Sequence, residues 1–450
     1  MKYAALRFGR VPLPEPGPGY DPAGDAVHLF APGIESPARE PIPGVQILDS
    51  FGEGHRFVVR VPDAWNGKLA VCGTPATRGE FANDLNLGDY LLARGYAFAS
   101  SNKGVPYNGI FEAATDTPAP TMAYPIPFDL FGLRAAGTVI RVGALHPRRV
   151  PVGEWHEDLA RLTRAARKHV RTATGRQPRR TYAVGLSIGG GQVRWMLERH
   201  PELVDGGVEW ASVFWSPEQS ILDYLPAFIA AMPDYVRSGF TDAAARDAIL
   251  AAGFPPDRLQ EDPAHPSLWN DHYANLAPFY GDLTTFAFGM LLDPELTSWT
   301  GSPPNLTDPV TGSGAGETPN ARGFALPAAR AAYVPSAAAR ATIAAFAHTG
   351  ALERPLIGLA GEADVFVTPA RNAETYLEAV RKAGRDDRYW QYRVQNGTHV
   401  DAYAGYGYGL QPMLPFVWAA FEQLERIVEH GERPAGAGSA RSVAEPRELG

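Results

Sequence analysis

The sequence predicts an α/β fold, in which a mainly parallel β-sheet is flanked by helices. Three observations lead to this prediction. Short runs rich in β-branched residues alternate with stretches of helical periodicity between residues 41 and 215. This alternation lapses over residues 216–350 and resumes at residue 351. Because alternating strands and helices form βαβ units, the two separated parts are expected to contribute strands to one sheet.

The early elements are expected to be four strands and one helix. Residues 56–61 have the β-branched content and the flanking turn residues of a strand. The other strands are expected over 45–48, 68–72 and 96–100, and the helix over 84–94.

The later elements follow from the same patterns. Apolar residues such as Leu159 and Leu162 recur at helical spacing, which predicts a helix over 154–174. Further strands are expected over 180–186, 204–214, 355–360 and 389–394, and further helices over 188–200, 369–384 and 412–429.

These patterns divide the chain into four parts. The Pro- and Gly-rich residues 1–40 are expected to form an extended arm. Residues 41–215 and 351–432 form the predicted core domain, and residues 216–350 a large, mainly helical cap inserted into it. Residues 433–450, rich in Pro, Ala, Gly and charges, are expected to be a flexible tail.

Aromatic residues are scattered through the predicted cap. They could line a binding site for apolar substrates, or they could form only the core of the cap itself. They are Tyr224, Phe228, Tyr235, Trp269, Tyr273, Phe279, Tyr280, Phe286, Phe288 and Trp299.

Composition excludes several classes of protein. Of the 450 residues, 45% are hydrophobic and 20% are charged, as in a folded globular protein. The formal net charge is −8 and basic residues are scattered, so neither a nucleic-acid partner nor a membrane partner is expected. Cys72 is the single cysteine, which rules out an intramolecular disulfide. With no apolar leader visible at the start, a cytoplasmic location is expected.

The residues Gly185-Leu186-Ser187-Ile188-Gly189 form the pattern G-x-S-x-G between a predicted strand and a predicted helix. A serine on such a tight turn projects its hydroxyl from the carboxyl edge of the sheet. The glycines allow backbone to approach closely, and the helix N-terminus favours developing negative charge. Ser187 is therefore the candidate nucleophile; the alternative is a glycine-rich packing turn.

A serine hydroxyl needs a base to accept its proton and an acid to orient that base. Asp364 follows the predicted strand 355–360, and His399 follows the predicted strand 389–394, in the chain order Ser…Asp…His. Glu362 is a weaker candidate for the acid. Asp364 could instead cap a turn, and His399 could be an ordinary surface histidine.

Other histidines are less well placed. Among the eleven in the chain, His146, His156, His272 and His348 do not follow a predicted strand. None of the histidine spacings matches a compact metal-binding motif, so neither a catalytic metal nor another cofactor is expected.

Attack on a carbonyl group also requires hydrogen-bond donors for the oxyanion. One is expected to be the backbone N–H of Ile188, directly after the nucleophile. The other is expected in the loop after the strand 68–72, where Thr74 is the candidate and Pro75 has no N–H to donate. The alternative for this loop is an ordinary turn.

Taken together, these residues resemble the α/β-hydrolase superfamily over about residues 56–429. Cys72-Gly73-Thr74-Pro75 is similar to its H-G-x-P oxyanion loop, with cysteine in place of histidine. Residues 361–364 (Gly-Glu-Ala-Asp) are similar to its G-x-x-D acid turn, and residues 101–104 (Ser-Asn-Lys-Gly) stand where many members carry D-x-R-G. The resemblance implies the α/β-hydrolase fold, with Ser187, His399 and Asp364 as the triad.

Two further stretches, residues 64–69 and 95–99, resemble esterases of the tannase/feruloyl esterase and hydroxybutyrate-oligomer hydrolase groups. Tannase-type enzymes carry cysteines beside the serine and the histidine, whereas Leu186, Thr398 and Val400 stand there in this chain. The resemblance within the superfamily is therefore distant.

The sequence thus predicts a serine hydrolase that acts on carboxylic esters through an acyl-enzyme, with aromatic, apolar or oligomeric esters as its substrates. An amide or peptide hydrolase with the same triad is the alternative, because the two reactions differ only in the leaving group. A catalytically silent binding protein is a third interpretation. The sequence does not indicate the oligomeric state.

Overall fold

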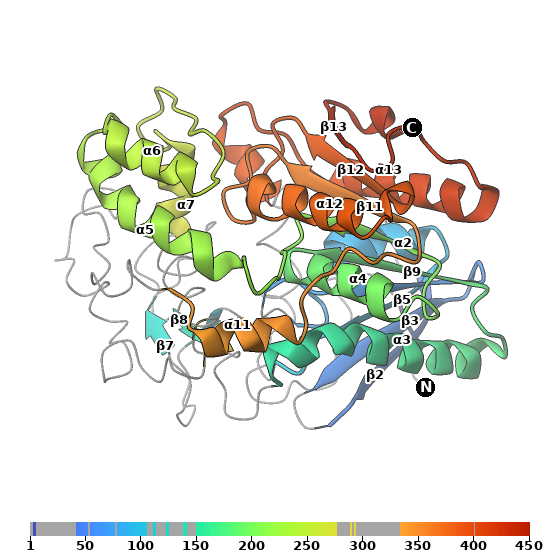
Figure 1. The fold of residues 1–450 in the computed structure, drawn as a ribbon. Coiled ribbons are helices and arrows are strands. Elements are labelled where there is room, and N and C mark those ends of the chain that lie inside the picture. Colours follow the sequence, from blue (N-terminus) through green and yellow to red (C-terminus); the bar gives the residue numbers. More distant parts are fainter. Residues whose placement is uncertain are drawn as a thin grey trace.

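The protein is described from a computed structural model (Figure 1). The described residues are 3–5, 42–52, 55–76, 79–105, 111–113, 123–125, 138–141, 150–276, 289, 292–293, 334–399 and 401–450. Part of the predicted arm, most of the loop before α3 (Val152–Thr174) and part of the predicted cap lie outside these residues.

A ten-stranded sheet forms the centre of the fold, in the order β1-β2-β3-β5-β4-β9-β10-β11-β12-β13. In chain order, its first five strands, β1 to β5, are Tyr3–Ala5, Pro43–Ser50, Arg56–Pro62, Lys68–Gly73 and Ala97–Ser101. The strands β9 to β13 are Arg180–Leu186, Gly206–Trp210, Leu356–Gly361, Tyr389–Val394 and Ala440–Val443. Pairing is antiparallel from β1 to β5 and parallel from β5 to β13.

Helices cover both faces of the sheet (Figure 1). The face packed by α3, α4 (Ile188–Arg199) and α12 (Ala373–Lys382) buries residues such as Leu69 and Val71 of β4. The face packed by α2 (Asp89–Ala93) and α13 (Leu414–Glu425) buries Ala70 and Cys72 of the same strand. Successive residues of a strand point to opposite faces, so a continuous apolar run is expected where both faces are covered.

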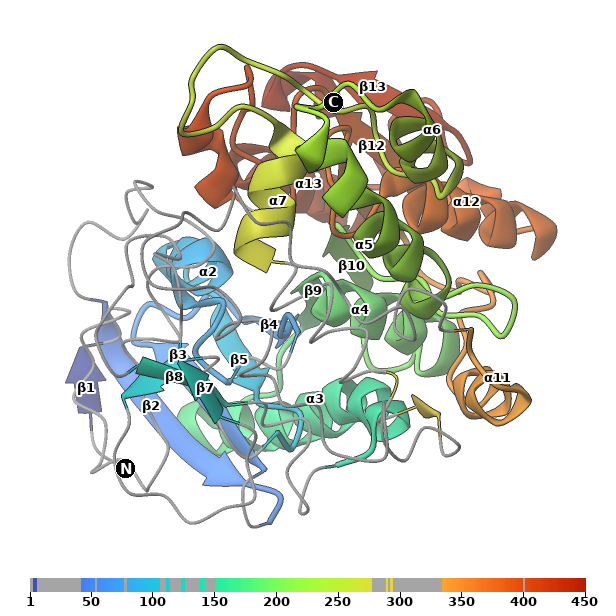
Figure 2. The ribbon, with the colours of Figure 1, turned by 90° about the vertical axis from the view of Figure 1, so that its left-hand side faces the viewer.

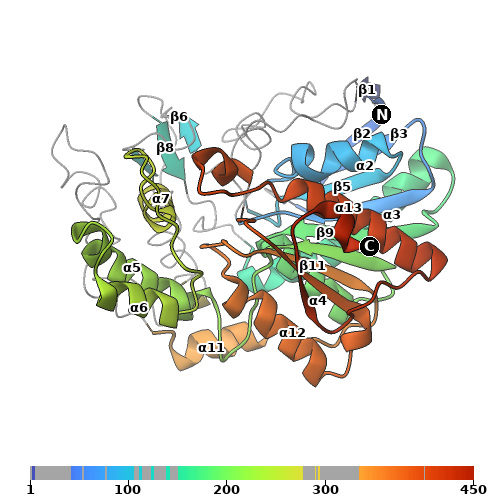
Figure 3. The same ribbon diagram turned by 90° about the horizontal axis from the view of Figure 1, so that it is seen from above.

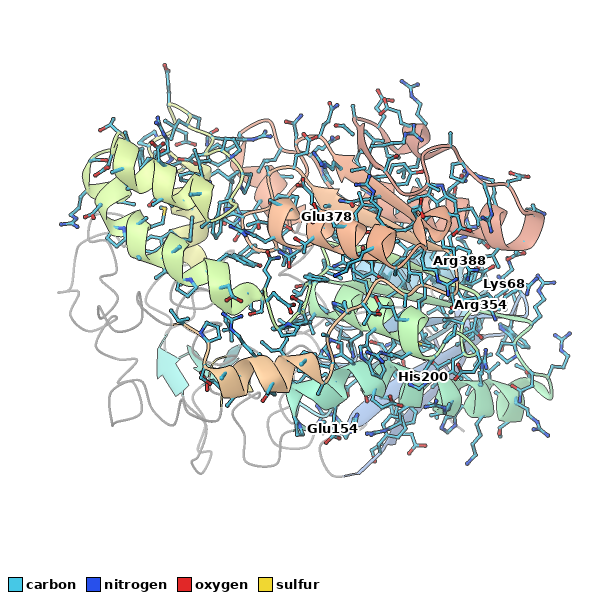
Figure 4. All side chains as sticks on the ribbon, viewed as in Figure 1. Lys68, Glu154, His200, Arg354, Glu378 and Arg388 are labelled. Atoms are coloured by element: carbon cyan, nitrogen blue, oxygen red, sulfur yellow. The ribbon has the colours of Figure 1, made fainter. Side chains whose placement is uncertain are left out.

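The carboxyl ends of the parallel strands face the helices of the predicted cap. Lys68, Arg354 and Arg388 stand at or just before the amino ends of β4, β11 and β12. All three lie at the end of the sheet away from α5 (Ile221–Arg237) and α6 (Ala243–Ala251) (Figure 4). In Figure 2 the sheet is seen from the carboxyl ends of its parallel strands, and α5 and α7 (Leu268–Leu276) lie on the viewer's side of it.

Within residues 216–350, the described part carries α5, α6, α7 and α11 (Ala337–Ala344) and adds no strand to the large sheet. The helix α5 begins with a capping box, in which the Ser220 hydroxyl accepts from the N–H of Leu222 and Asp223 accepts from the N–H of Ser220. Seen from above, α5, α6 and α7 stand apart from the layers that enclose the sheet (Figure 3). We retain the term cap for residues 216–350 as a proposal.

Along the chain, the residues between β5 and α3 form a second, small antiparallel sheet. It has the order β6-β8-β7, formed by Phe111–Ala113, Thr138–Arg141 and Ala123–Pro125. Of the predicted N-terminal arm, only Tyr3–Ala5 are described; they form β1 and pair with β2. The rest of the arm lies outside the described residues.

The prediction of a flexible tail over residues 433–450 is wrong. Residues Ala440–Val443 form β13, which pairs in parallel with β12 at the edge of the sheet. The side chains of Val443 and Leu449 are buried, and the hydroxyl of Tyr392 donates to the carbonyl oxygen of Leu449 at 3.0 Å. Composition suggested disorder. The segment is ordered instead because Val443 and Leu449 bury their side chains and because β13 pairs with the edge of β12.

The predicted strand over 204–214 is shorter in the structure. The strand β10 ends at Trp210, because Ala211 adopts a left-handed backbone conformation with φ of 47°. Its N–H donates to the carbonyl oxygen of Leu359 at 2.7 Å, and the chain then turns away from the sheet. None of the described helices combines the length and the apolar character needed to span a bilayer.

Candidate active site

The turn between β9 and α4 holds Ser187 in a strained conformation. Its backbone angles are φ 59° and ψ −119°, which cost about 1–3 kcal/mol for a residue other than glycine. The N–H of Ser187 donates to the carbonyl oxygen of Trp210 at 2.9 Å, and its carbonyl oxygen accepts from Val213 at 3.2 Å. The neighbouring strand therefore fixes the serine at the carboxyl edge of the sheet.

Glycine is required on both sides of this turn. A methyl group on Gly185 would lie 2.3 Å from the carbonyl oxygen of Gly189. A methyl group on Gly189 would lie 2.1 Å from the carbonyl oxygen of Gly73, and 2.8 Å from the nitrogen of Thr74. These distances are too short for any side chain, so the G-x-S-x-G pattern reflects direct backbone contact between the turn and the loop after β4.

Asp364 and His399 meet at the same edge of the sheet. The Nδ1 atom of His399 lies 2.8 Å from Oδ2 of Asp364. The other carboxylate oxygen of Asp364 accepts from the N–H groups of Phe366 and Val367 at 2.8 and 2.9 Å. Because a carboxylate only accepts, Nδ1 carries the proton, and Nε2 is left free to accept one.

The two loops that carry these residues are pinned to each other. The N–H of Ala363 donates to the carbonyl oxygen of Gly397 at 2.8 Å, and that of Glu362 donates to the carbonyl oxygen of Val394 at 3.0 Å. The side chain of Glu362 accepts from the hydroxyl of Ser442 in β13 at 2.8 Å. Of the two acidic candidates, it is Asp364 that contacts His399.

The loop after β4 brings Thr74 against the serine turn, as the contact with Gly189 shows. The amide of Asn83 donates to the carbonyl oxygen of Gly73 at 3.0 Å. In a trans peptide the C=O and the N–H point in opposite directions, so this bond also fixes the direction of the Thr74 N–H. Ile188, the other predicted donor, is the first residue of α4, where backbone N–H groups lack intrahelical partners.

A buried lysine supports the same loop. The Nζ atom of Lys103 donates to the carbonyl oxygen of Thr74 at 3.0 Å and also to the Thr74 hydroxyl. That hydroxyl donates in turn to the carbonyl oxygen of Ser101 at 3.0 Å. Lys103 is fully buried and its φ is 57°, so its charge and its backbone are both held at a cost in free energy.

Cys72 does not present a reactive thiol in this site. Its side chain is buried, and its Sγ accepts from the Asn83 amide at 3.1 Å. Burial raises the pKa of the Cys72 thiol well above its ordinary value, so the thiol stays protonated. No group of three or more His, Cys, Asp or Glu side chains that could hold a metal ion occurs among the described residues.

Comparison with known proteins gives similarity in structure but not in sequence. Models of protein families and curated proteins give no match to this sequence. Among solved structures, the chain is similar to feruloyl esterase B from Aspergillus oryzae, with 13% identity, a TM-score of 0.52, and coverage of 92% of this chain and 87% of that chain. This level of identity carries information on the fold alone. The fold is that of the α/β-hydrolases.

Two other solved structures are less similar. An esterase from Aspergillus oryzae has 12% identity and a TM-score of 0.49, with coverage of 88% of this chain and 82% of that chain. A tannin acyl hydrolase from Aspergillus niger has 13% identity and a TM-score of 0.44, with coverage of 87% of this chain and 80% of that chain. Ser187 follows β9 in a sharp strand-to-helix turn, which is the context in which the sequence predicts the nucleophile.

The described cap aromatics pack mainly against one another. Phe228 stacks on Phe254 with ring centroids 4.6 Å apart, and Trp269 lies 5.3 Å from Tyr235. These rings form the core of the cap, which was the simpler of the two interpretations. Phe279, Tyr280, Phe286, Phe288 and Trp299 lie outside the described residues.

The structure adds residues that sequence reasoning did not assign to the site. Asn83 and Lys103 hold the loop of Thr74, and His272 of α7 lies close enough to His399 to interact with it electrostatically. The sequence analysis does not select His272, because this residue does not follow a predicted strand. No local pattern marks it, since its position depends on how the cap packs.

Proposed function

We propose that this chain is a serine hydrolase that cleaves carboxylic esters through an acyl-enzyme intermediate. The observation that carries the proposal is the hydrogen bond between His399 and Asp364 at the sheet edge that also holds Ser187 in its strained turn. Strained backbone persists where the surrounding structure enforces it, and functional sites are where it is concentrated.

In the proposed reaction, the Oγ of Ser187 attacks the acyl carbon while Nε2 of His399 accepts the hydroxyl proton. Asp364 holds the imidazole in the required tautomer and stabilises its positive charge. The tetrahedral intermediate collapses when His399 returns the proton to the departing alcohol. A water molecule then attacks the acyl-enzyme while Nε2 of His399 accepts its proton. The acid is released when His399 returns that proton to the departing Oγ of Ser187.

The negative oxygen of the intermediate would accept hydrogen bonds from the N–H groups of Ile188 and Thr74. Fixed backbone donors of this kind are each worth about 10²–10³ in kcat. The contact between Gly189 and Gly73 supports this pairing, because it keeps the two donor loops at a constant separation. Lys103 and Asn83 act in the proposal as positioning residues, since they hold Thr74 without touching the substrate.

Aromatic, apolar or oligomeric esters are the proposed substrates. The ring of Phe366 lies 5.2 Å from the ring of His399, and Tyr403 lies 6.0 Å from Phe366. The support for an apolar substrate therefore comes from Phe366, which is only partly buried and packs against the ring of His399. The described aromatics of the cap contribute less, because they pack against one another.

Labelling with a fluorophosphonate tests the proposal directly. The wild-type protein is expected to be labelled at one peptide, which contains Ser187, and the Ser187→Ala variant is expected to stay unlabelled. If the wild type is not labelled, or if both proteins are labelled equally, the proposal is wrong.

Matched substrates decide between the two kinds of hydrolase. Phenylpropanoyl ethyl ester and phenylpropanoyl ethyl amide share their acyl group and differ only at the leaving atom. An ester hydrolase is expected to cleave the ester and to leave the amide intact, since an amidase or peptidase with the same triad would turn over both. Turnover of the amide at a kcat/KM within about 100-fold of that for the ester would show that the alternative, an amide or peptide hydrolase, is correct.

A further inference from the structure

The cap brings a second histidine beside the proposed catalytic base. His272 lies in α7, and its ring stacks on Tyr403 with centroids 4.1 Å apart and an interplanar angle of 14°. Phe366 packs against the ring of His272 at 5.0 Å and against the ring of His399 at 5.2 Å. One aromatic side chain therefore lies between the two histidines.

The position of α7 is fixed by contacts to the loop that follows His399. The hydroxyl of Tyr408 donates to Oδ2 of Asp271 at 2.6 Å. The guanidinium of Arg258 donates to the carbonyl oxygen of Tyr408 at 3.0 Å, and His265 stacks on Tyr406 at 4.3 Å. These contacts join the cap to the core domain. The position of His272 is therefore fixed by them as well as by the stack of its ring on Tyr403.

The protonation of His272 follows from its neighbours. Its Nδ1 lies 2.8 Å from the carbonyl oxygen of Leu268, and a carbonyl oxygen only accepts, so Nδ1 carries a proton. Burial, and to a smaller extent the nearby His399, lower the pKa of His272 to about 3. The ring is therefore neutral near pH 7, and its Nε2 bears a lone pair.

This lone pair has no hydrogen-bond partner among the described residues, and the residue is only 2% exposed. The buried His348 differs, because its Nδ1 accepts from the N–H of Trp215 at 3.1 Å and its Nε2 donates to the carbonyl oxygen of Gly191 at 2.9 Å. The buried His156 also has ring nitrogens without a partner, but of the two it is His272 that interacts electrostatically with His399. A buried acceptor without a partner is costly, and such groups in folded proteins call for a functional reason.

We infer that Nε2 of His272 accepts a hydrogen bond from a hydroxyl group of the ester substrate and so determines specificity. The inference rests on the proposed function. A cationic donor is disfavoured, because His399 becomes positively charged during the reaction, and a carboxylate would place one acceptor against another. A neutral hydroxyl avoids both problems, because it carries no positive charge and it can donate a hydrogen bond. Since Phe366 contacts both histidines, the hydroxyl must lie within a few atoms of the scissile carbonyl.

Matched esters test this inference. The probes are the ethyl esters of 3-phenylpropanoic acid with a hydroxyl at carbon 2 or at carbon 3, each compared with its methoxy counterpart. The methoxy group keeps the oxygen and its inductive effect but cannot donate. For at least one of the two positions, wild-type kcat/KM is expected to be about 10- to 100-fold higher for the hydroxy ester.

The variants isolate the acceptor. His272→Phe keeps a flat ring against Tyr403 and removes the acceptor, so the hydroxy-to-methoxy ratio is expected to fall toward one. His430→Phe is the matched control, because it makes the same exchange at an exposed histidine outside the cap, and it is expected to keep the wild-type ratio. A wild-type ratio near one at both positions, or equal ratios in the two variants, would overturn the inference.

A second measurement does not depend on the folding of His272→Phe. In the Ser187→Ala variant, a bound hydroxy ester is expected to shift the ¹⁵N resonance of His272 Nε2 upfield, and the methoxy ester is not. Equal shifts with both esters would contradict the inference. The proposed function fails separately, since a wild-type protein that resists fluorophosphonate and cleaves no ester refutes the triad, whereas an active enzyme indifferent to the hydroxyl refutes only the role of His272.

Discussion

Replacing Asp364 by asparagine tests the proposed triad at its least exposed member. The Oδ1 atom of an asparagine at this position can still accept from the N–H groups of Phe366 and Val367, which now donate at 2.8 and 2.9 Å. The amide nitrogen would then face Nδ1 of His399, 2.8 Å from the present position of Oδ2. Two donors cannot share that distance, so the imidazole must move its proton to Nε2.

That tautomer cannot accept the proton of Ser187. A general base held in the wrong tautomer costs about 10³–10⁴ in kcat, which corresponds to about 4–5.5 kcal/mol of transition-state stabilisation. The free energy of unfolding is expected to change little, because both backbone hydrogen bonds to residue 364 persist. Asp364→Asn should therefore be folded, with a melting temperature within a few degrees of the wild type, and almost inactive.

Hydrolysis of an activated aryl ester gives kcat, and circular dichroism gives the melting temperature. Glu362→Gln is the matched control, because it changes a carboxylate to an amide in the same turn, where the side chain bonds to Ser442 and not to His399. It should keep kcat within a few-fold of the wild type. The reasoning is refuted if folded Asp364→Asn retains more than about a tenth of the activity, or if Glu362→Gln loses as much as Asp364→Asn.

Three further predictions concern the surroundings of the site. Lys103→Met should lower kcat about 10- to 100-fold with little change in KM, because Thr74 loses the ammonium that holds its carbonyl oxygen; an unchanged kcat in steady-state assays would remove Lys103 from the argument. Burial lowers the pKa of His156 to about 4 from an ordinary value near 6.5, so the unfolded chain takes up the proton first as the pH falls. Compared with His156→Phe, the wild type should therefore lose roughly 2 kcal/mol of unfolding free energy between pH 7.5 and pH 5 in urea titrations, and a difference that does not vary with pH would contradict this. Deleting residues 433–450 should destabilise the protein by about 3–6 kcal/mol through the loss of buried side chains such as Val443, and calorimetry that shows no fall in melting temperature would contradict the role of β13.

Much of the core domain follows from patterns that are local in the sequence. The predicted strand over 180–186 coincides with β9, and the predicted helix over 154–174 differs from α3 by only two residues at its start. Both segments carry a clear period of hydrophobicity, and covered strands in a parallel sheet leave little freedom of register. The chain order of serine, acid and base is equally local, because each candidate directly follows its own strand.

The tail and the end of β10 could not be predicted in this way. Residues 433–450 have the composition of a disordered segment, yet β13 pairs with an edge of β12 that lies about fifty residues earlier in the chain. The strand β10 ends early because Ala211 bonds to Leu359 of a strand far along the sequence. In both cases the deciding partner is distant in sequence, so no window along the chain contains the signal.

The sequence by itself determined the α/β architecture, the strand-to-helix turn of Ser187, and Asp364 and His399 as its candidate partners. These depend on residue spacing and on a glycine pattern that can be read within a few positions of the chain, even though the contact between Gly189 and Gly73 is visible only in the structure. Only the tertiary structure decided that Asp364 rather than Glu362 contacts His399, that Asn83 and Lys103 hold the loop of Thr74, and that the cap places His272 next to His399. Such contacts join side chains across elements packed in three dimensions, and the hydrophobic period that forms each element carries no information on which polar groups will meet.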